Sequence, residues 1–228
     1  MTKSIVVVGA SRGIGCEIVK QLACNSEYQI LALSRNVERM NSEFGDLQNV
    51  SCKRLDLGSE NVRNTCEDLF SELETVDILI NNAGFLMNKA FTEITRTDLD
   101  TSYSINVFGV IETVQAVIPK MRKGHIVNIS SIGGFQGSVK FPGLTAYSTS
   151  KAALCSFTEL FAEEYKETLI SMNCLCLGAA QTEMLEEAFP GYEAPVSAEK
   201  MAEYIVDFSL NADQWMNGKI IPVSLSTP

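Results

Sequence analysis

The stretch Ser4-Ile5-Val6-Val7-Val8-Gly9-Ala10-Ser11-Arg12-Gly13-Ile14-Gly15 decides the fold of this chain. A short β-branched run enters a glycine-rich turn, and residues 14–24 then continue with the periodicity of a helix. The glycines let backbone amides approach a pyrophosphate, and the start of a helix adds free N–H groups and a positive dipole end. A glycine-rich turn can also be a plain connection, but the order strand, turn, helix favours a dinucleotide site.

The same alternation of short apolar runs and longer helical stretches continues along the chain. The predicted strands are residues 5–8, 29–34, 50–53, 77–80, 125–129, 171–176 and 219–223, and the predicted helices are residues 14–24, 60–73, 96–121, 146–168 and 198–210. Several strands are continuously apolar, as expected where helices cover both faces of a sheet. The pattern predicts one α/β domain over residues 1–228, a Rossmann-type doubly wound parallel sheet of about seven strands with helices on both faces.

Composition excludes several classes of partner. The 228 residues carry a net charge of −10, which argues against nucleic acid and anionic membranes because both require a basic surface. No apolar stretch approaches the roughly 18 residues of a membrane span. The first strand begins almost at the N-terminus and leaves no room for a signal peptide, so a cytoplasmic protein is expected.

The seven cysteines show no CxxC spacing, and the chain has a single histidine, His125. We interpret the cysteines as small buried apolar side chains in a reducing compartment, and no metal site is predicted.

The end of the second predicted strand bears on the choice of cofactor. An NAD site usually presents an acidic residue there, roughly 20 residues past the glycines, but this chain has Ser34-Arg35 and no acid until Glu38. Arg12 and Arg35 could flank a ribose 2′-phosphate, whose two negative charges suit two guanidinium groups. The pattern favours NADP(H) over NAD(H), the alternative being two solvated surface arginines.

Further motifs follow in order: Asp56-Leu57, Asn81-Asn82-Ala83-Gly84, Asn106, Ile129-Ser130-Ser131, Tyr147-Ser148-Thr149-Ser150-Lys151, and the segment from Gly178 to Met184. Together with the glycine turn they resemble the classical branch of the short-chain dehydrogenase/reductase family over nearly the whole chain. The resemblance implies an NADP(H)-dependent oxidoreductase that transfers a hydride between nicotinamide and the carbonyl or alcohol carbon of a small or medium substrate.

The resemblance also implies catalytic roles. Tyr147 and Lys151 are four residues apart on a predicted helix and share one face. A phenol has a pKa of about 10, which a nearby ammonium group lowers. Tyr147 would be the general acid/base, Lys151 would also bind the nicotinamide ribose, and Ser131 would orient the substrate oxygen. Asn106 would support a water linked to Lys151.

The cofactor contacts implied by the family are Gly9, Ser11, Arg12, Gly13, Ile14, Gly15, Ser34, Arg35, Asp56, Leu57, Asn82, Ala83, Gly84, Tyr147, Lys151, Gly178 and Thr182. The expected substrate contacts are Ser131, Phe135, Phe141, Met184 and Phe189, the last two in a lid segment after Thr182.

Family members commonly pair through the helices that carry Asn106 and Tyr147, so a homodimer or homotetramer is expected. Two other functions stay open. One is a non-catalytic NADP(H)-sensing or regulatory protein of the same fold, and the other is epimerisation or dehydration by the same residues.

Overall fold

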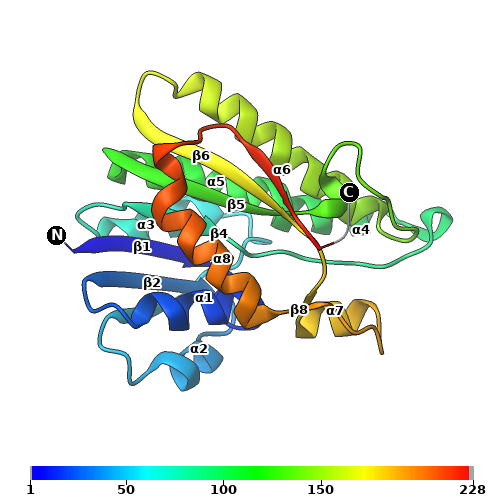
Figure 1. The fold of residues 1–228 in the computed structure, drawn as a ribbon, viewed down its shortest axis with the longest axis horizontal. Coiled ribbons are helices and arrows are strands. Elements are labelled where there is room, and N and C mark those ends of the chain that lie inside the picture. The colour runs from blue at the N-terminus through cyan, green and yellow to red at the C-terminus, as the bar shows by residue number, and fades with distance from the viewer. Residues whose placement is uncertain (1, 226–228) are drawn as a thin grey trace.

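The computed structural model describes residues 2–225, so Met1 and residues 226–228 of the predicted domain lie outside it. Within these residues a seven-stranded parallel sheet has the order β3-β2-β1-β4-β5-β6-β9 (Figure 1). Its strands are β1 (Lys3–Val8), β2 (Tyr28–Ser34), β3 (Val50–Arg54), β4 (Ile78–Asn81), β5 (Lys123–Ser131), β6 (Leu169–Leu177) and β9 (Ile220–Val223). The predicted fold class is confirmed.

The strand order reverses direction beside β1, which pairs with β2 on one side and with β4 on the other. In an open parallel sheet the connections diverge at such a point and leave a crevice beyond the carboxyl ends of the strands. Because the glycine turn follows β1, it lies at this crevice.

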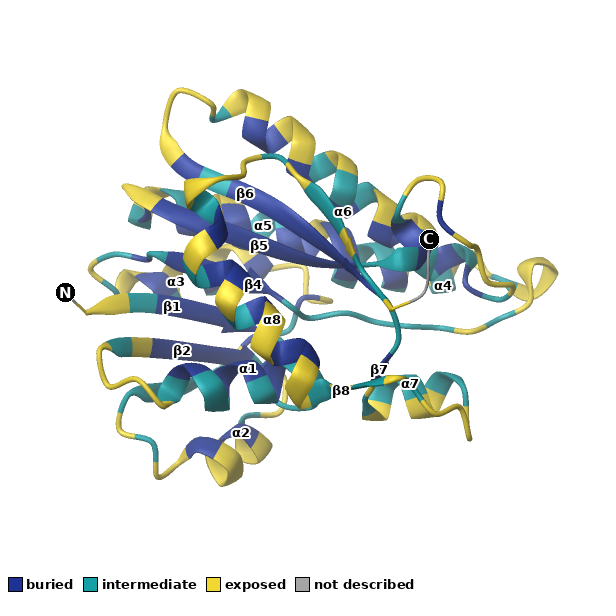
Figure 2. Cartoon of the chain, in the orientation of Figure 1, coloured by how far each residue is buried: buried dark blue, intermediate teal, exposed yellow. Residues whose placement is uncertain are grey.

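Helices cover both faces of the sheet and close two apolar cores (Figures 1 and 2). One face carries α1 (Gly13–Ala23), α2 (Val37–Phe44) and α8 (Ala198–Asn211), and the other carries α3 (Val62–Ser71), α5 (Gly109–Val117) and α6 (Thr145–Glu164). The inner strands β1, β2, β4, β5 and β6 are mostly buried, whereas the edge strands β3 and β9 are partly exposed (Figure 2). Burial on both faces explains why the inner strands read as continuous apolar runs.

The helix predicted over residues 96–121 is interrupted. It consists of α4 (Arg96–Tyr103), a π-helical turn η2 (Ser104–Phe108), α5 and a 3-10 turn η3 (Ile118–Lys120). A capping box between Thr95 and Asp98 starts α4. The π-turn contains Asn106, and π-turns within helices are frequent at functional sites.

Two helices were not predicted from the sequence, α2 and the short α7 (Glu183–Ala188). The lid segment that contains α7 is attached through a small two-stranded sheet of β7 (Ala180–Gln181) and β8 (Val196–Ser197). Among residues 2–225, no helix combines the length and the apolar character that a membrane crossing requires.

Candidate active site

A cavity of about 460 Å³ opens at the carboxyl ends of the strands, and motifs from the whole length of the chain line it. This volume lies in the range typical of small-molecule and cofactor sites. Of the residues predicted from the sequence, those lining the cavity are Gly9, Ser11, Arg12, Gly13, Ile14, Ser34, Arg35, Asp56, Leu57, Asn82, Ala83, Gly84, Ser131, Phe141, Tyr147, Lys151, Gly178, Thr182, Met184 and Phe189.

The glycine turn packs too closely against its surroundings to accept side chains. Gly9 has φ +86, and a Cβ there would lie 2.6 Å from the backbone of Ala83. A Cβ on Gly15 would lie 2.1 Å from the carbonyl oxygen of Gly9, which also accepts a 3.0 Å hydrogen bond from Asn82 Nδ2. Gly15 therefore packs behind the turn and does not line the cavity. The turn leaves the start of α1 open to the cavity, as binding of a pyrophosphate requires.

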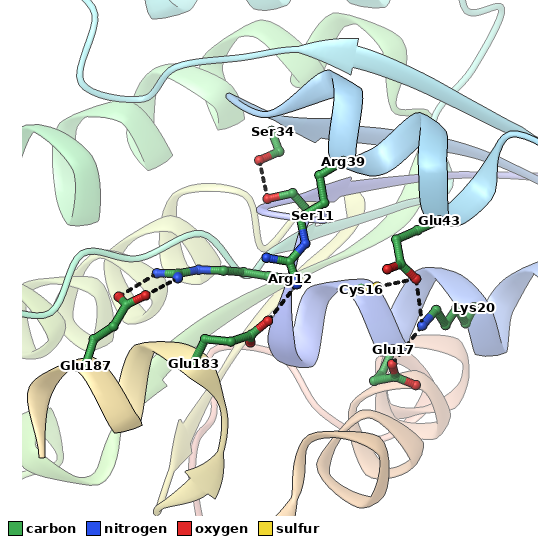
Figure 3. Close-up of polar contacts among 10 residues, drawn as sticks. All are labelled: Ser11, Arg12, Cys16, Glu17, Lys20, Ser34, Arg39, Glu43, Glu183 and Glu187. Carbon is green, nitrogen blue, oxygen red and sulfur yellow. Dashed lines mark hydrogen bonds and ion pairs between the residues drawn. The ribbon is translucent and has the colours of Figure 1, made fainter. Parts of the chain in front are cut away.

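Polar and basic side chains surround the part of the cavity next to the glycine turn (Figure 3). Ser34 Oγ donates a 2.8 Å hydrogen bond to Ser11 Oγ, which joins the end of β2 to the glycine turn. Arg12 and Arg35 both line the cavity, and Arg35 is exposed. The predicted pair of arginines is thus present at one end of the site.

Arg12 and a further arginine, Arg39 of α2, form ion pairs with the lid segment. Arg12 forms an ion pair with Glu187 of α7, and Arg39 Nη2 lies 2.7 Å from Glu183 Oε1 (Figure 3). The hydrogen bond from Arg12 holds the pKa of Glu187 below its usual value and raises the pKa of Arg12. Sequence reasoning missed Arg39, because the helix α2 that carries it was not predicted.

The catalytic candidates Ser131, Tyr147 and Lys151 meet at the other end of the cavity. Ser131 is the last residue of β5, while Tyr147 and Lys151 lie in the first turns of α6. Lys151 is buried and donates a 2.8 Å hydrogen bond from Nζ to the carbonyl oxygen of Ile129. Its Nζ lies 5.9 Å from the centroid of the Tyr147 ring.

The expected effect of Lys151 on the tyrosine is not found in this structure. Burial raises the pKa of Tyr147 to about 12, while a hydrogen-bonding contribution from Ser131 acts in the opposite direction. Burial also lowers the pKa of Lys151 to about 8. Lys151 Nζ lies over the tyrosine ring and is bound to Ile129, so desolvation dominates over attraction to an ammonium group.

Asn106 is buried and does not line the cavity. Its Oδ1 accepts a 2.7 Å hydrogen bond from the backbone N–H of Phe85, and its Nδ2 donates to the carbonyl oxygen of Phe85 at 2.9 Å and to Ser150 Oγ at 2.9 Å. A Cβ on Gly84 would lie 3.3 Å from Lys151 Nζ and 3.7 Å from Asn106 Oδ1, so both side chains adjoin Gly84. Asn106 thus fixes the segment after β4 beside Lys151.

The predicted substrate contacts in the cavity lining are mostly apolar. Phe141, Met184 and Phe189 line the cavity as predicted, but Phe135 does not. The turn after Ser131 packs Gly133 and Gly134 tightly against α6, and the chain has left the cavity by the time it reaches Phe135. Leu185 and Tyr192 of the lid segment also line the cavity, as their apolar character predicts, while Ile105 and Leu144 were not predicted from the sequence. The position of Ile105 beside Asn106 is a signal that could have identified it.

Comparisons with known proteins agree with this geometry. The family model described as short chain dehydrogenase matches residues 3–193. The 3-oxoacyl-(acyl-carrier-protein) reductase FabG of Aquifex aeolicus is 28% identical over 240 residues, covering 97% of this chain and 96% of that protein. The oxidoreductase UcpA of Salmonella typhimurium is 34% identical over 191 residues, covering 81% of this chain and 72% of its own length.

Among solved structures, a short chain dehydrogenase from Burkholderia cenocepacia in complex with NADP superposes with a TM-score of 0.86 at 24% identity. The match covers 97% of this chain and 96% of that one. This chain therefore belongs to the short-chain dehydrogenase/reductase family of oxidoreductases.

Proposed function

We propose that this protein is an NADP(H)-dependent carbonyl reductase or alcohol dehydrogenase with Tyr147 as general acid/base. One observation carries the proposal: Ser131, Tyr147 and Lys151 line the same cavity as the glycine turn and the two arginines, Arg12 and Arg35. A nucleotide extended from the turn would place its reactive end beside the tyrosine.

The nicotinamide cofactor, when bound, supplies or accepts the hydride. The chain handles the proton and the geometry. Tyr147 donates its phenolic proton to the carbonyl oxygen during reduction and accepts it from the alcohol in the reverse direction. Ser131 orients that oxygen by a hydrogen bond, and Lys151 holds the ribose. Burial raises the pKa of Tyr147, so at neutral pH the phenol carries the proton that reduction consumes.

Three features support NADP(H) over NAD(H). Arg12 and Arg35 line the adenosine end, Ser34 stands where an acidic residue would repel a 2′-phosphate, and Arg39 lies on the neighbouring helix. The Burkholderia structure with NADP shares this fold.

The apolar lining near Tyr147 supports a small or medium apolar carbonyl compound as substrate. The lid helix presents Glu183, Glu186 and Glu187, which would repel a large anionic substrate. The relatives named as a 3-oxoacyl reductase and as carbonyl reductase family member 4 of Xenopus laevis, the latter 31% identical, are consistent with carbonyl reduction.

The test is oxidation of NADPH and of NADH over a panel of ketones, aldehydes and diketones, with the wild type and Tyr147→Phe. We expect turnover with NADPH, and a loss of about 10²–10⁴-fold in kcat in the variant without loss of NADPH binding. Tyr165→Phe, on the same helix face as Phe161 and away from the cavity, is the matched control. A preference for NADH would refute the assignment of the arginines, and full activity of Tyr147→Phe would refute the role of the tyrosine.

A non-catalytic NADP(H) sensor is the second candidate. It predicts tight NADPH binding with no turnover on any compound. Product analysis separates net reduction from epimerisation or dehydration, in which the cofactor is not consumed.

A further inference from the structure

Three cysteines distant in sequence meet behind the catalytic residues. Cys155 lies on α6, and Cys174 and Cys176 lie on β6. Their sulfur atoms all lie within 4.8 Å of one another, and Cys155 Sγ is 3.5 Å from Cys176 Sγ. Over residues 2–225, no other group of three His, Cys, Asp or Glu residues meets this spacing.

The fold accounts for the cluster. Alternate residues of a strand point to the same face of a sheet, so Cys174 and Cys176 share one face of β6. Leu175 and Leu177, the residues between and after them, belong to the core on the opposite face, beneath α1 and α8. Cys174 and Cys176 therefore face α6, where Cys155 lies one turn beyond Lys151.

The spacing of the sulfurs fits a metal ion. A metal–sulfur bond of about 2.3 Å places thiolate sulfurs about 3.8 to 4.0 Å apart in tetrahedral or trigonal coordination. Cys155 Sγ and Cys176 Sγ lie 3.5 Å apart and no pair of the three sulfurs is more than 4.8 Å apart, so shifts of an ångström or less give that spacing. A disulfide would use two of the sulfurs and leave the third without a role.

We propose that Cys155, Cys174 and Cys176 form a binding site for a single thiophilic cation of the Cu(I), Zn²⁺ or Cd²⁺ class. Thiolate ligands select such soft ions over Mg²⁺ or Ca²⁺. Binding replaces three S–H bonds with three S–metal bonds, and the three protons pass to solvent. No electron is transferred, so neither an oxidant nor a reductant is required.

The half-buried Cys155 gives the ion a route from the surface, while Cys174 and Cys176 are fully buried. Among the described residues no fourth Cys, His, Asp or Glu joins the group. Three sulfur ligands without a fourth protein ligand suit Cu(I) better than a structural Zn²⁺ site, which normally has four.

Metal binding at the cysteine cluster would change hydrogen bonds next to the catalytic residues. Ser130 Oγ donates to the carbonyl oxygen of Lys151 at 2.8 Å, and Cys155 Sγ donates to the same oxygen at 3.5 Å. A metal-bound thiolate cannot donate, so binding removes the second of these bonds beside Ser131 and Lys151. We expect lower turnover in the metal-bound protein, and only this consequence rests on the proposed function.

Binding is tested on the full-length, reduced protein under anaerobic conditions with Cd²⁺ as the probe. Thiolate-to-cadmium absorption in the ultraviolet reports the sulfur ligands, and metal analysis after gel filtration gives the stoichiometry. We expect one Cd²⁺ per chain, displaced by Cu(I). Cys155→Ser and Cys174→Ala should each weaken Cd²⁺ binding more than about 100-fold, since even the loss of a group that only supports a ligand costs about 10- to 100-fold.

Two control variants show whether the loss of binding is specific to the three cysteines. Cys66→Ala removes an equally buried cysteine outside the cluster, and Cys24→Ser removes an exposed one. Both should retain the absorption band and the stoichiometry, and circular dichroism verifies folding of every variant. Equal loss of binding in a control, or unchanged binding in Cys155→Ser, would overturn the proposal. The proposal would also be overturned if the reduced protein bound no cadmium and a Cys155–Cys176 disulfide formed in air. None of these readouts requires enzymatic activity, so failure of the site is distinguishable from failure of the proposed function.

Discussion

Lys151 is a buried basic residue whose burial makes stability depend on pH. It is 3% exposed, and burial lowers its pKa from 10.5 to about 8. Between these two pH values the unfolded chain binds a proton that the folded chain has lost, so stability rises with pH across this window. We expect the free energy of unfolding of the wild type, relative to Lys151→Met, to rise by roughly 3 kcal/mol from pH 8 to pH 10.5.

Urea unfolding at a series of pH values measures this difference. Lys166→Met, at an exposed position on the surface, controls for the loss of one positive charge. If the wild type and Lys151→Met change in parallel over this window, Lys151 is charged in the folded protein well above pH 8, and the effect of burial is smaller than inferred.

Gly9 tests whether the glycine turn requires the absence of a side chain or only its backbone angle. Gly9 and Gly137 have nearly the same φ, +86 and +83, but a Cβ on Gly137 meets nothing within 4 Å. Gly137→Ala should lower the free energy of unfolding by about 1–2 kcal/mol, because an alanine at a positive φ is strained. Gly9→Ala should lower the free energy of unfolding by roughly 1–3 kcal/mol more, because its Cβ overlaps the backbone of Ala83. We also expect Gly9→Ala to lose NADPH binding. Equal losses of stability in the two variants would show that the close packing relaxes freely.

At the scale of elements, α7 is attached to the cofactor end through Arg12–Glu187 and Arg39–Glu183 (Figure 3). A 2′-phosphate would compete with these carboxylates for the guanidinium groups. We therefore expect Glu187→Gln to tighten NADPH binding a few-fold and to leave NADH binding unchanged. The gain should shrink as salt is added, because exposed charges are screened.

Fluorescence titration of both cofactors measures the effect. Glu203→Gln, which removes a glutamate paired with Lys200 on α8, is the control for net charge. A parallel change in NADH affinity would mean that the lid acts on the nicotinamide half of the cofactor.

The sequence predicted the sheet better than the segments that depend on distant contacts. All seven strands lie within two residues of their predicted ends, because continuous β-branched runs between helical stretches are a local signal. The helix α2 was missed because a Ser34-Arg35-Asn36 junction reads as a loop, although Asn36 caps the helix through Arg39 N. The π-turn at Asn106 depends on bonds to Phe85, 21 residues away, which no local pattern encodes.

In the site, too, residues placed by local sequence signals were predicted, and residues placed by distant contacts were not. Motifs that sit at strand ends reach the cavity because parallel strands end at one edge of the sheet. Phe135 was wrongly assigned to the cavity, since the course of a loop depends on how Gly133 and Gly134 pack. The cysteine cluster was not predicted because its three members do not have the CxxC spacing. Cys174-x-Cys176 shares a strand face, but only the packing of α6 on β6 brings Cys155 to it.

For the whole molecule, the π-turn η2 and the helix α6, which carries Tyr147, leave large apolar side chains exposed to solvent. Phe108, at the end of η2, is 54% exposed, and Leu160, on α6, is 68% exposed. Burial of a leucine or phenylalanine side chain contributes about 1.5–3 kcal/mol, so a partner that covered both would gain substantially. We expect a homodimer that pairs through α5 and α6.

Light scattering coupled to gel filtration tests this prediction over a range of protein concentrations. Leu160→Asp should raise the dimer dissociation constant at least about tenfold, since it removes apolar burial and places a charge in the interface. Phe91→Asp is the control, because Phe91 is 75% exposed but lies on neither helix. Dissociation by Phe91→Asp and not by Leu160→Asp would place the interface elsewhere. A wild type that is monomeric at every concentration would refute the pairing, and the exposed apolar side chains would then need another partner.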